Sequence, residues 1–128
     1  MILDNPALAS LPAGAAMAPY LLVKLSGGTY LPAGPTDVAL GVSGRPYRQG
    51  ETCQPRRHTA GNLTIQASGA IALGAVVVQD LGGKVKSLPT SGGGTARVVG
   101  VAQQAAAADG DWIDVEPVSF GTTVTIPA

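Results

Sequence analysis

The residues of this chain that could do chemistry at a reactive centre are few and lie apart from suitable partners. His58 is the only histidine and Cys53 the only cysteine, so an internal disulfide is excluded. His58 follows Arg56 and Arg57 in a polar stretch, which favours a solvated loop histidine. The arginines could lower the pKa of the Cys53 thiol. No base accompanies the thiol, however, and we expect it to be buried and inert.

Four acidic side chains near residue 110 are the next candidates, as ligands for a metal ion. They are Asp109, Asp111, Asp114 and Glu116. Asp114 and Glu116 alternate along a predicted strand, and the spacing is not that of a calcium-binding loop. The glycine-rich "SGGGT" at residues 91–95 lacks the Gly-Lys-Ser/Thr and the following helix of a phosphate-binding loop. We therefore expect no catalytic site, no metal and no cofactor.

Two segments carry opposite charge although the formal net charge of the whole chain is zero. Residues 45–57 hold four arginines against one glutamate, a balance of 4 − 1 = +3, whereas residues 109–116 hold four acids and no base. Ordinary solvated loop charge is one interpretation. The other is pairing across subunits or with a partner of opposite sign, which would set orientation more than affinity. The zero total gives no general attraction to nucleic acid or to an anionic membrane.

The composition favours one loop-rich β domain. Apolar residues make up 45% of the 128 residues but aromatic residues only 4%, so the core must consist mainly of Val, Leu, Ile and Ala. Eighteen glycines and ten prolines make long helices improbable. No apolar run approaches the roughly 20 residues that span a bilayer. The start, "MILDNPALASLPAGAAMAP", has Asp4 and no basic residue, which argues against a signal peptide, and residues 1–19 are predicted to form an extended arm.

Internal similarity predicts a tandem duplication, with chance similarity in a Gly/Ala/Val-rich chain as the alternative. "GAAMAPYLLVKLSGG" at 14–28 lies over "GAIALGAVVVQDLGG" at 69–83 without a gap. Three shorter matches follow in the same order: "ALGV" (39–42) with "VVGV" (98–101), "GET" (50–52) with "GDW" (110–112), and "NLTI" (62–65) with "TVTI" (123–126). Copy one would span about 14–67 and copy two about 69–128, together forming a single β domain over 20–128.

Alternation and turn residues predict the strands. They are expected at 20–25, 38–43, 51–54 and 63–67, and then at 75–80, 84–88, 97–103, 111–116 and 122–127. "LLV" and "AVVV", at 21–23 and 75–78, are continuous apolar runs, as expected where both faces of a strand are covered. The glycine pairs at 27–28 and 82–83 favour tight hairpins with positive φ. The alanines at 105–108 are expected in a close-packed loop. Trp112 is expected mainly in the core beneath the corner at 109–111, with an interface anchor as the alternative.

The second half of the chain resembles the small capsid decoration, or cement, proteins of tailed bacteriophages. The resemblance is carried by "GAIALGAVVVQDLGGKVKSLPTSGGGTARVVGVAQQAAAADGDWIDVEPVSFGTTV", in which a strand entry, a hairpin and a Gly/Thr-rich loop come first. "ARVVGVA", an alanine-rich loop with an acidic glycine corner, and a closing strand follow. The similarity covers roughly the last 60 residues and, through the duplication, 14–67 more weakly. The chain departs from the family in its two copies and its Arg-rich loop.

The resemblance implies an all-β fold, a small sandwich or barrel that is jellyroll-like or a β-tulip. It implies a virion protein that is assembled in the host cytoplasm and binds the outer surface of a mature head. The expected partners are the major capsid protein and further copies of the chain, as a homotrimer or, less typically, a homodimer. An N-terminal arm often reaches onto the capsid lattice in such proteins, and proline limits the entropy that an arm loses when it is laid down.

The predicted contact residues fall into three groups. They are Leu3, Pro6, Leu8 and Leu11 in the arm, Arg45, Arg48, Arg56 and Arg57 in the basic segment, and Asp109 and Asp111 at the acidic corner.

Two other functions stay open. A biotinyl or lipoyl carrier domain would place a modifiable lysine at a hairpin tip, where Lys84 in "GGK" is the candidate, although the acidic or methionine neighbours expected there are absent. A carbohydrate-binding or tail-fibre module would expose aromatic side chains as sugar platforms, and the chain has one Trp, three Tyr and one Phe.

Overall fold

Short strands joined by glycine and proline turns make up the computed structural model, which describes residues 9–56, 62–118 and 122–128. This confirms the predicted all-β class. The elements in chain order are β1 (Leu11–Pro12), β2 (Leu22–Ser26), β3 (Thr29–Pro32), β4 (Gly41–Val42), β5 (Thr52–Cys53), β6 (Leu63–Gln66), β7 (Val76–Gln79), the 3₁₀ turn η1 (Leu81–Gly83), β8 (Val85–Ser87), β9 (Thr95–Ala102), β10 (Trp112–Pro117) and β11 (Thr123–Thr125).

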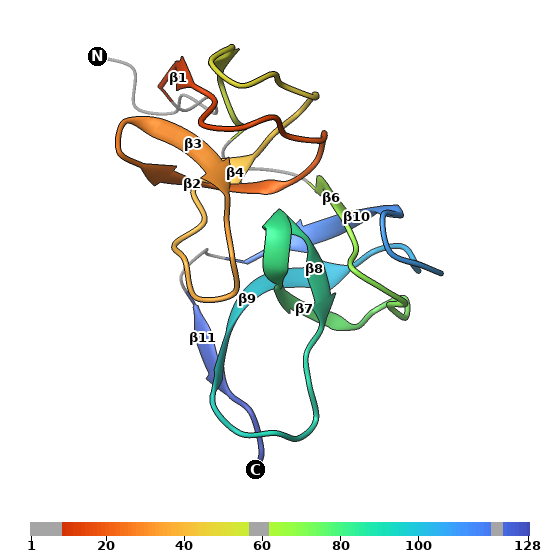
Figure 1. The fold of residues 1–128 in the computed structure, drawn as a ribbon. Coiled ribbons are helices and arrows are strands. Elements are labelled where there is room, and N and C mark those ends of the chain that lie inside the picture. The colour runs from red at the N-terminus through yellow and green to blue at the C-terminus, as the bar shows by residue number, and fades with distance from the viewer. Residues whose placement is uncertain (1–8, 57–61, 119–121) are drawn as a thin grey trace, which may run out of the picture.

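The strands form three antiparallel sheets (Figure 1). One has the order β3-β2-β4, a second pairs β1 with β5, and the largest has the order β6-β10-β9-β7-β8, with β11 added along β9. None of these sheets closes on itself within the described residues. An isolated parallel bridge between Ala13 and Tyr30 links the β1–β5 sheet to β3. A second one, between Ala67 next to β6 and Val85 in β8, links the two edges of the largest sheet through a single residue pair.

The backbone hydrogen bonds of residues 9–56, here called unit one, recur in residues 63–118, called unit two. The pairing of Leu22 with Val42 between β2 and β4 is repeated by Val76 with Val101 between β7 and β9. In the same way, the bridge between Met17 and Tyr47 is repeated between Ile71 and Ala106, and the bridge at Ala13 is repeated at Ala67. Each strand of unit one therefore has a structural counterpart in unit two.

The unit boundaries differ from those predicted. Strand β6 pairs with β10 as β1 pairs with β5, so β6 begins the second unit rather than ending the first. The proposed match of residues 62–65 with 123–126 is wrong, because β11 pairs with β9 instead. The ungapped alignment of the first match is also one residue out of register. The Tyr20 N–H donates to Ser43 O as the Gly74 N–H donates to Ala102 O, so Tyr20 corresponds to Gly74.

The described part of the predicted arm is folded into unit one. β1 pairs with β5, and Ala13 and Met17 are buried. The boundary at residue 19 is therefore wrong, because these side chains complete a core that the following strands alone would leave open. Residues 1–8 lie outside the described residues. Strand β3 was also missed, and β4 and β5 are two residues long where longer strands were expected.

Each unit has its own apolar core, and strand β2 contributes to both. Val23 lies in the cluster of unit one with Met17, Leu21, Tyr30, Tyr47 and Cys53. Leu22, on the opposite face, joins Ala33, Ala39 and Val42 in a cluster made otherwise of unit two, including Ile65, Val77, Val85 and Ile113. Leu22 and Val23 are both 0% exposed. The prediction that both faces of this run are covered is confirmed, and the second cover is the other unit.

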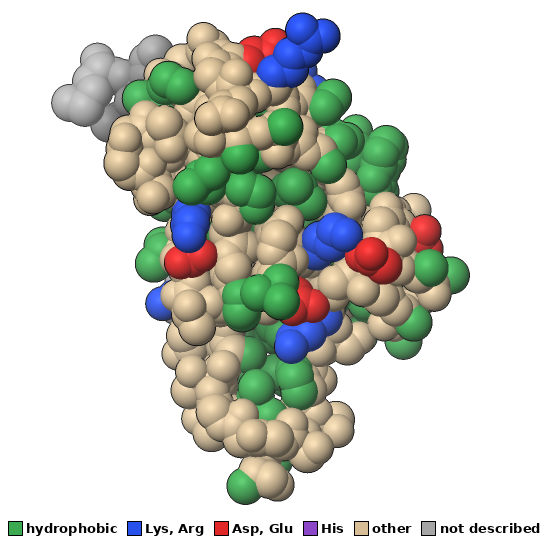
Figure 2. Space-filling model, viewed as in Figure 1, with side chains coloured by type: hydrophobic (Ala, Val, Ile, Leu, Met, Phe, Trp, Pro, Cys, Tyr) green, Lys and Arg blue, Asp and Glu red, His purple; other side chains and the backbone are tan. Residues whose placement is uncertain are grey.

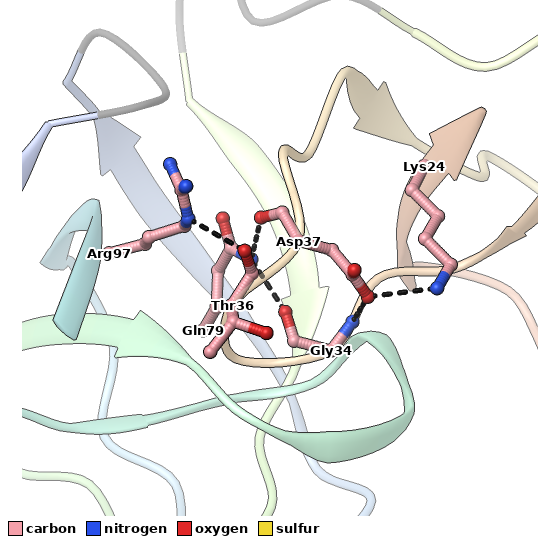
Figure 3. Close-up of polar contacts among 6 residues, drawn as sticks. All are labelled: Lys24, Gly34, Thr36, Asp37, Gln79 and Arg97. Carbon is pink, nitrogen blue, oxygen red and sulfur yellow. Dashed lines mark hydrogen bonds and ion pairs between the residues drawn. The ribbon is translucent and has the colours of Figure 1, made fainter. Parts of the chain in front are cut away.

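Polar contacts clamp the loop after β3 onto unit two (Figure 3). The Gln79 side-chain amide donates to Gly34 O at 2.8 Å and to Asp37 O at 2.9 Å. Arg97 Nε donates to Thr36 O at 3.1 Å. Gln79 is buried, so losing these acceptors would leave an unsatisfied amide in the joint.

Asp37 shapes that same loop from within. Its Oδ2 accepts the Gly34 N–H at 2.8 Å and lies 3.0 Å from Lys24 Nζ. The Gly34 hydrogen bond, and then the hydrogen bond from Lys24, hold the pKa of the Asp37 carboxyl below its ordinary value.

Gly83 brings the two units into close contact at η1. Its N–H donates to Ala33 O at 2.9 Å, its φ is +80°, and an added Cβ would lie 2.7 Å from Leu22 O. Gly82 also has a positive φ, +70°, but nothing lies within 4 Å of an added Cβ there. The pair of glycines was predicted to turn the chain, and the second one also allows the joint to close.

Gly83→Ala should therefore destabilise the protein more than Gly82→Ala does. Both substitutions force an L side chain into the left-handed region, at about 1–2 kcal/mol. Only Gly83→Ala adds a clash with backbone of the other unit, which costs roughly 1–3 kcal/mol more. Urea unfolding of the two variants measures the difference, and equal unfolding free energies would contradict the tight joint.

Asp37→Asn should lower the melting temperature at neutral pH and lose that effect in acid. A carboxyl whose folded pKa is lowered adds stability above its unfolded pKa of about 4, and this stability disappears as pH falls through the folded pKa. We expect a loss of about 1 kcal/mol at pH 7. The difference from the parent protein should shrink steadily below about pH 4.

Thermal melts at pH 7 and in mild acid measure this difference. Asp109→Asn is the matched control, since the Asp109 side chain is 65% exposed and its ion pair should contribute little at either pH. An Asp37→Asn deficit that stays constant down to the acid limit would refute the assignment.

Candidate interaction surfaces

The basic segment forms a structured turn with its arginines at the surface. The Arg45 guanidinium lies over the Tyr47 ring, 4.3 Å from the centroid, and Arg45 Nη1 is 3.6 Å from Glu51 Oε1. Glu51 also accepts the Arg48 N–H at 3.1 Å. Arg45, Arg48 and Arg56 are exposed, and within the described residues no ion pair involves Arg48 or Arg56. Arg57 and His58 lie outside the described residues.

The acidic corner is the counterpart of that basic turn in unit two. The Gly50 N–H donates to Ala13 O, and the Gly110 N–H donates to Ala67 O. The Asp111 carboxylate accepts the N–H groups of Ala107 and Ala108, at 2.8 and 3.1 Å, so it caps its own alanine-rich turn. The same turn is thus built twice, once with a basic and once with an acidic surface.

Two further acids of this segment, Asp109 and Asp114, also have partners within the chain. Asp109 Oδ1 lies 2.7 Å from Lys84 Nζ, and Asp114 Oδ1 accepts the Thr64 hydroxyl at 3.0 Å. Less of this charge is available to a partner than the sequence suggested. Lys84, the lysine of the carrier-domain alternative, is held in this ion pair with a side chain 28% exposed.

Of the four contact residues predicted in the arm, the structure describes one. Leu3, Pro6 and Leu8 lie outside the described residues. Leu11 is half-buried, pairs with Cys53 and packs against the core of unit one, so it is a structural residue rather than part of a free arm.

Cys53 is buried, as expected, and burial raises the pKa of its thiol. Among the described residues no group of three or more His, Cys, Asp and Glu side chains could hold a metal ion. In the same part of the chain, no helix has the length and apolar character needed to cross a membrane.

Trp112 lies at the surface, and its assignment to the core is wrong. Its side chain is 56% exposed, whereas Ile113 and Val115 are buried, because β10 turns its odd-numbered residues inward. The Trp112 ring meets the Tyr20 ring edge-on, with centroids 4.7 Å apart. The two side chains form an aromatic surface pair that the sequence analysis did not identify.

Tyr20 has φ = +63°, the only positive φ of a non-glycine residue in the described chain, and its counterpart Gly74 has φ = +84°. A tyrosine in this region is strained, which glycine avoids. Tyr20 lines a hollow of about 270 Å³ beside the joint, together with Val42, Gly44, Arg56, Asn62, Leu63 and Thr64. A repeat alignment placing Tyr20 over Gly74 would have singled out this position.

Charge on the visible face is dispersed. Figure 2 shows Lys and Arg side chains scattered among Asp and Glu side chains, with no broad field of one sign. This arrangement favours a contact selected by shape and by a few local charges over one selected by bulk electrostatics.

No protein-family model matches the chain, and no curated protein sequence does. Among solved structures, the head fiber gp8.5 N base of bacteriophage phi29 is similar, with a TM-score of 0.69 over 88% of this chain and 92% of that one. The chain has the fold of that head fiber base. The sequence identity is 16%, so the likeness concerns the fold.

Proposed function

We propose that this chain is a structural protein of a tailed-phage virion, which binds the outer surface of the head and stabilises it by bridging major capsid protein subunits. The observation that carries the proposal is the fold likeness to the phi29 head fiber base, which extends over most of both chains. The resemblance of residues 69–124 to capsid decoration proteins supports the same role from features of the sequence.

The stabilisation would come from linkage. A protein that binds the mature lattice, and not its precursor, lowers the free energy of the mature lattice by its own binding free energy. Several copies joined in one oligomer, for which a homotrimer is the favoured state, would gain further through effective concentration. No reaction and no cofactor is part of this proposal.

The basic turn is the contact surface that we propose. Arg48 and Arg56 are exposed and lack an ion pair within the described part of the chain, so an acidic partner surface would meet little competition for them. The acidic corner is a weaker candidate, since Asp109 and Asp111 already have partners.

Co-sedimentation with heads of the phage that carries this sequence tests the proposal. The purified chain should pellet with mature heads that lack it, pellet less with procapsids, and raise the temperature at which mature heads break open. The double variant Arg48→Glu/Arg56→Glu should bind more weakly, most clearly at low salt. Lys86→Glu, which reverses one charge on β8 instead of two, is the control and should bind normally. A parent chain that ignores both particles would exclude a capsid role.

Carbohydrate binding is a second candidate, favoured by the exposure of Trp112. Aromatic rings carry an apolar face that a sugar ring can cover, and the neighbouring hollow supplies Arg56, Asn62 and Thr64 as hydrogen-bonding groups. Binding on a glycan array should then be lost in Trp112→Ala and kept in Leu81→Ala, which also removes an exposed apolar side chain. An array without signal for the parent chain would dispose of this candidate.

A further inference from the structure

The joint between the two units is formed by different faces of the same repeated structure. Unit one contributes Leu22 and Val42, from the outer face of β2 and β4. Unit two contributes the end of β7 and η1, where Gln79 and Gly83 receive the loop after β3. The face of unit one in the joint has an equivalent face on unit two, and the face of unit two has an equivalent on unit one. Neither of these two equivalent faces takes part in the joint.

The face of unit two that is equivalent to the outer face of β2 and β4 is apolar and exposed. Val76 and Val101 occupy the positions of Leu22 and Val42. Leu22 is 0% exposed, whereas Val76 is 38% exposed and Val101 is half-buried. Leu73, which corresponds to Pro19 beside the joint, is 68% exposed. The expectation that both faces of the run at 75–78 are covered is wrong at Val76, since the described residues leave this side chain 38% exposed.

The face of unit one that is equivalent to the end of β7 and η1 is apolar as well. Leu25 pairs with Tyr30 in the β2–β3 hairpin as Gln79 pairs with Val85 between β7 and β8. Gln79 is 3% exposed because the joint covers it, whereas Leu25 is 51% exposed. Gln79 is therefore the residue that the loop after β3 covers, and Leu25 is the equivalent residue that nothing in the described chain covers to the same extent.

The loop after β8 in unit two corresponds to the loop after β3 in unit one, which packs on unit two, and it is also directed outward. The Leu88 N–H donates to Val76 O as the Ala33 N–H donates to Leu22 O, which places the start of the two loops at matching positions. The loop after Leu88 projects with β11 from the end of the molecule away from unit one (Figure 1). Hydrogen bonds from Gly93 to Pro127 O and from Ile126 to Gly94 O fasten it to the C-terminal segment.

We infer that a second copy of this chain docks end to end, with Leu73, Val76 and Val101 of one copy against the Leu25 end of unit one in the next. This contact would repeat between chains the joint that already exists within the chain. It is heterologous, so it closes into a ring if the rotation between copies closes and otherwise extends into a filament. A three-copy ring would supply the homotrimer of the proposed function, which this inference deepens.

Complementation between two blocked variants tests the inference without any capsid. The parent chain should assemble in sedimentation velocity at high micromolar concentration. Leu25→Asp and Val76→Asp should each weaken assembly by roughly tenfold or more, because each places an unpaired charge in an apolar contact. Each variant keeps one intact end, so an equimolar mixture should form a one-to-one heterodimer that grows no further.

Leu81→Asp is the matched control. Leu81 is 72% exposed but lies in η1, at the joint already occupied within the chain, so this variant should assemble as the parent does. Circular dichroism melts verify folding, and Leu25→Lys and Val76→Lys replace any Asp variant that does not fold.

Three results would overturn the inference. They are a parent chain that stays monomeric, an assembly that only one of the two end variants disturbs, and a mixture of the two variants that remains monomeric. Because the assay contains no heads, a failure of head binding would leave its outcome unchanged, and the two proposals fail separately.

Discussion

Strand β2 is the element on which this fold depends, because it is covered on both faces by different halves of the chain. Val23 completes the core of unit one, and Leu22, the adjacent residue, enters the core of unit two. Alternation along a strand makes this the only way for two consecutive apolar side chains both to be buried. Neither unit is complete alone, since unit one without its neighbour would expose Leu22, Ala33, Ala39 and Val42 to water. Two small β units with few aromatic residues thereby share enough apolar surface to fold as one body.

The polar groups at this joint select one arrangement from those that the apolar contact would allow. The buried amide of Gln79 finds its two acceptors only when the loop after β3 lies in one place, and Asp37 holds that loop in shape from the inside. Outside the joint, charge is used locally, as in the Asp111 cap and the Lys84–Asp109 pair. The exposed arginines of the basic turn and the apolar ends of the units are accordingly the surfaces that we propose for recognition.

The sequence predicted the features that depend on local chemistry. The glycine pair at 27–28 does turn β2 into β3, because positive φ is a property of glycine itself. It also predicted most strands of unit two, where alternation is regular. Trp112 was misplaced although the pattern held the answer, since it shares a face with Asp114 and Glu116. What could not be foreseen is which half covers which, because an apolar run shows that a face is buried and not what buries it. Strand β3 was missed because its four residues follow directly on the turn and end in proline.

The two units also differ in length, and two of the differences lie in their connections. Unit two has a 3₁₀ turn where unit one has a two-residue hairpin turn. The segment of unit two from β8 to the part of β9 that pairs with β7 is also longer than the segment of unit one from β3 to β4. A residue added inside a strand would turn every following side chain to the opposite face, whereas a residue added in a connection leaves the pairing intact. Foreign peptides grafted into the Gly27–Gly28 bend or the 89–94 loop would on this ground be carried without disturbing either core, which makes these two sites natural positions for tags and display epitopes.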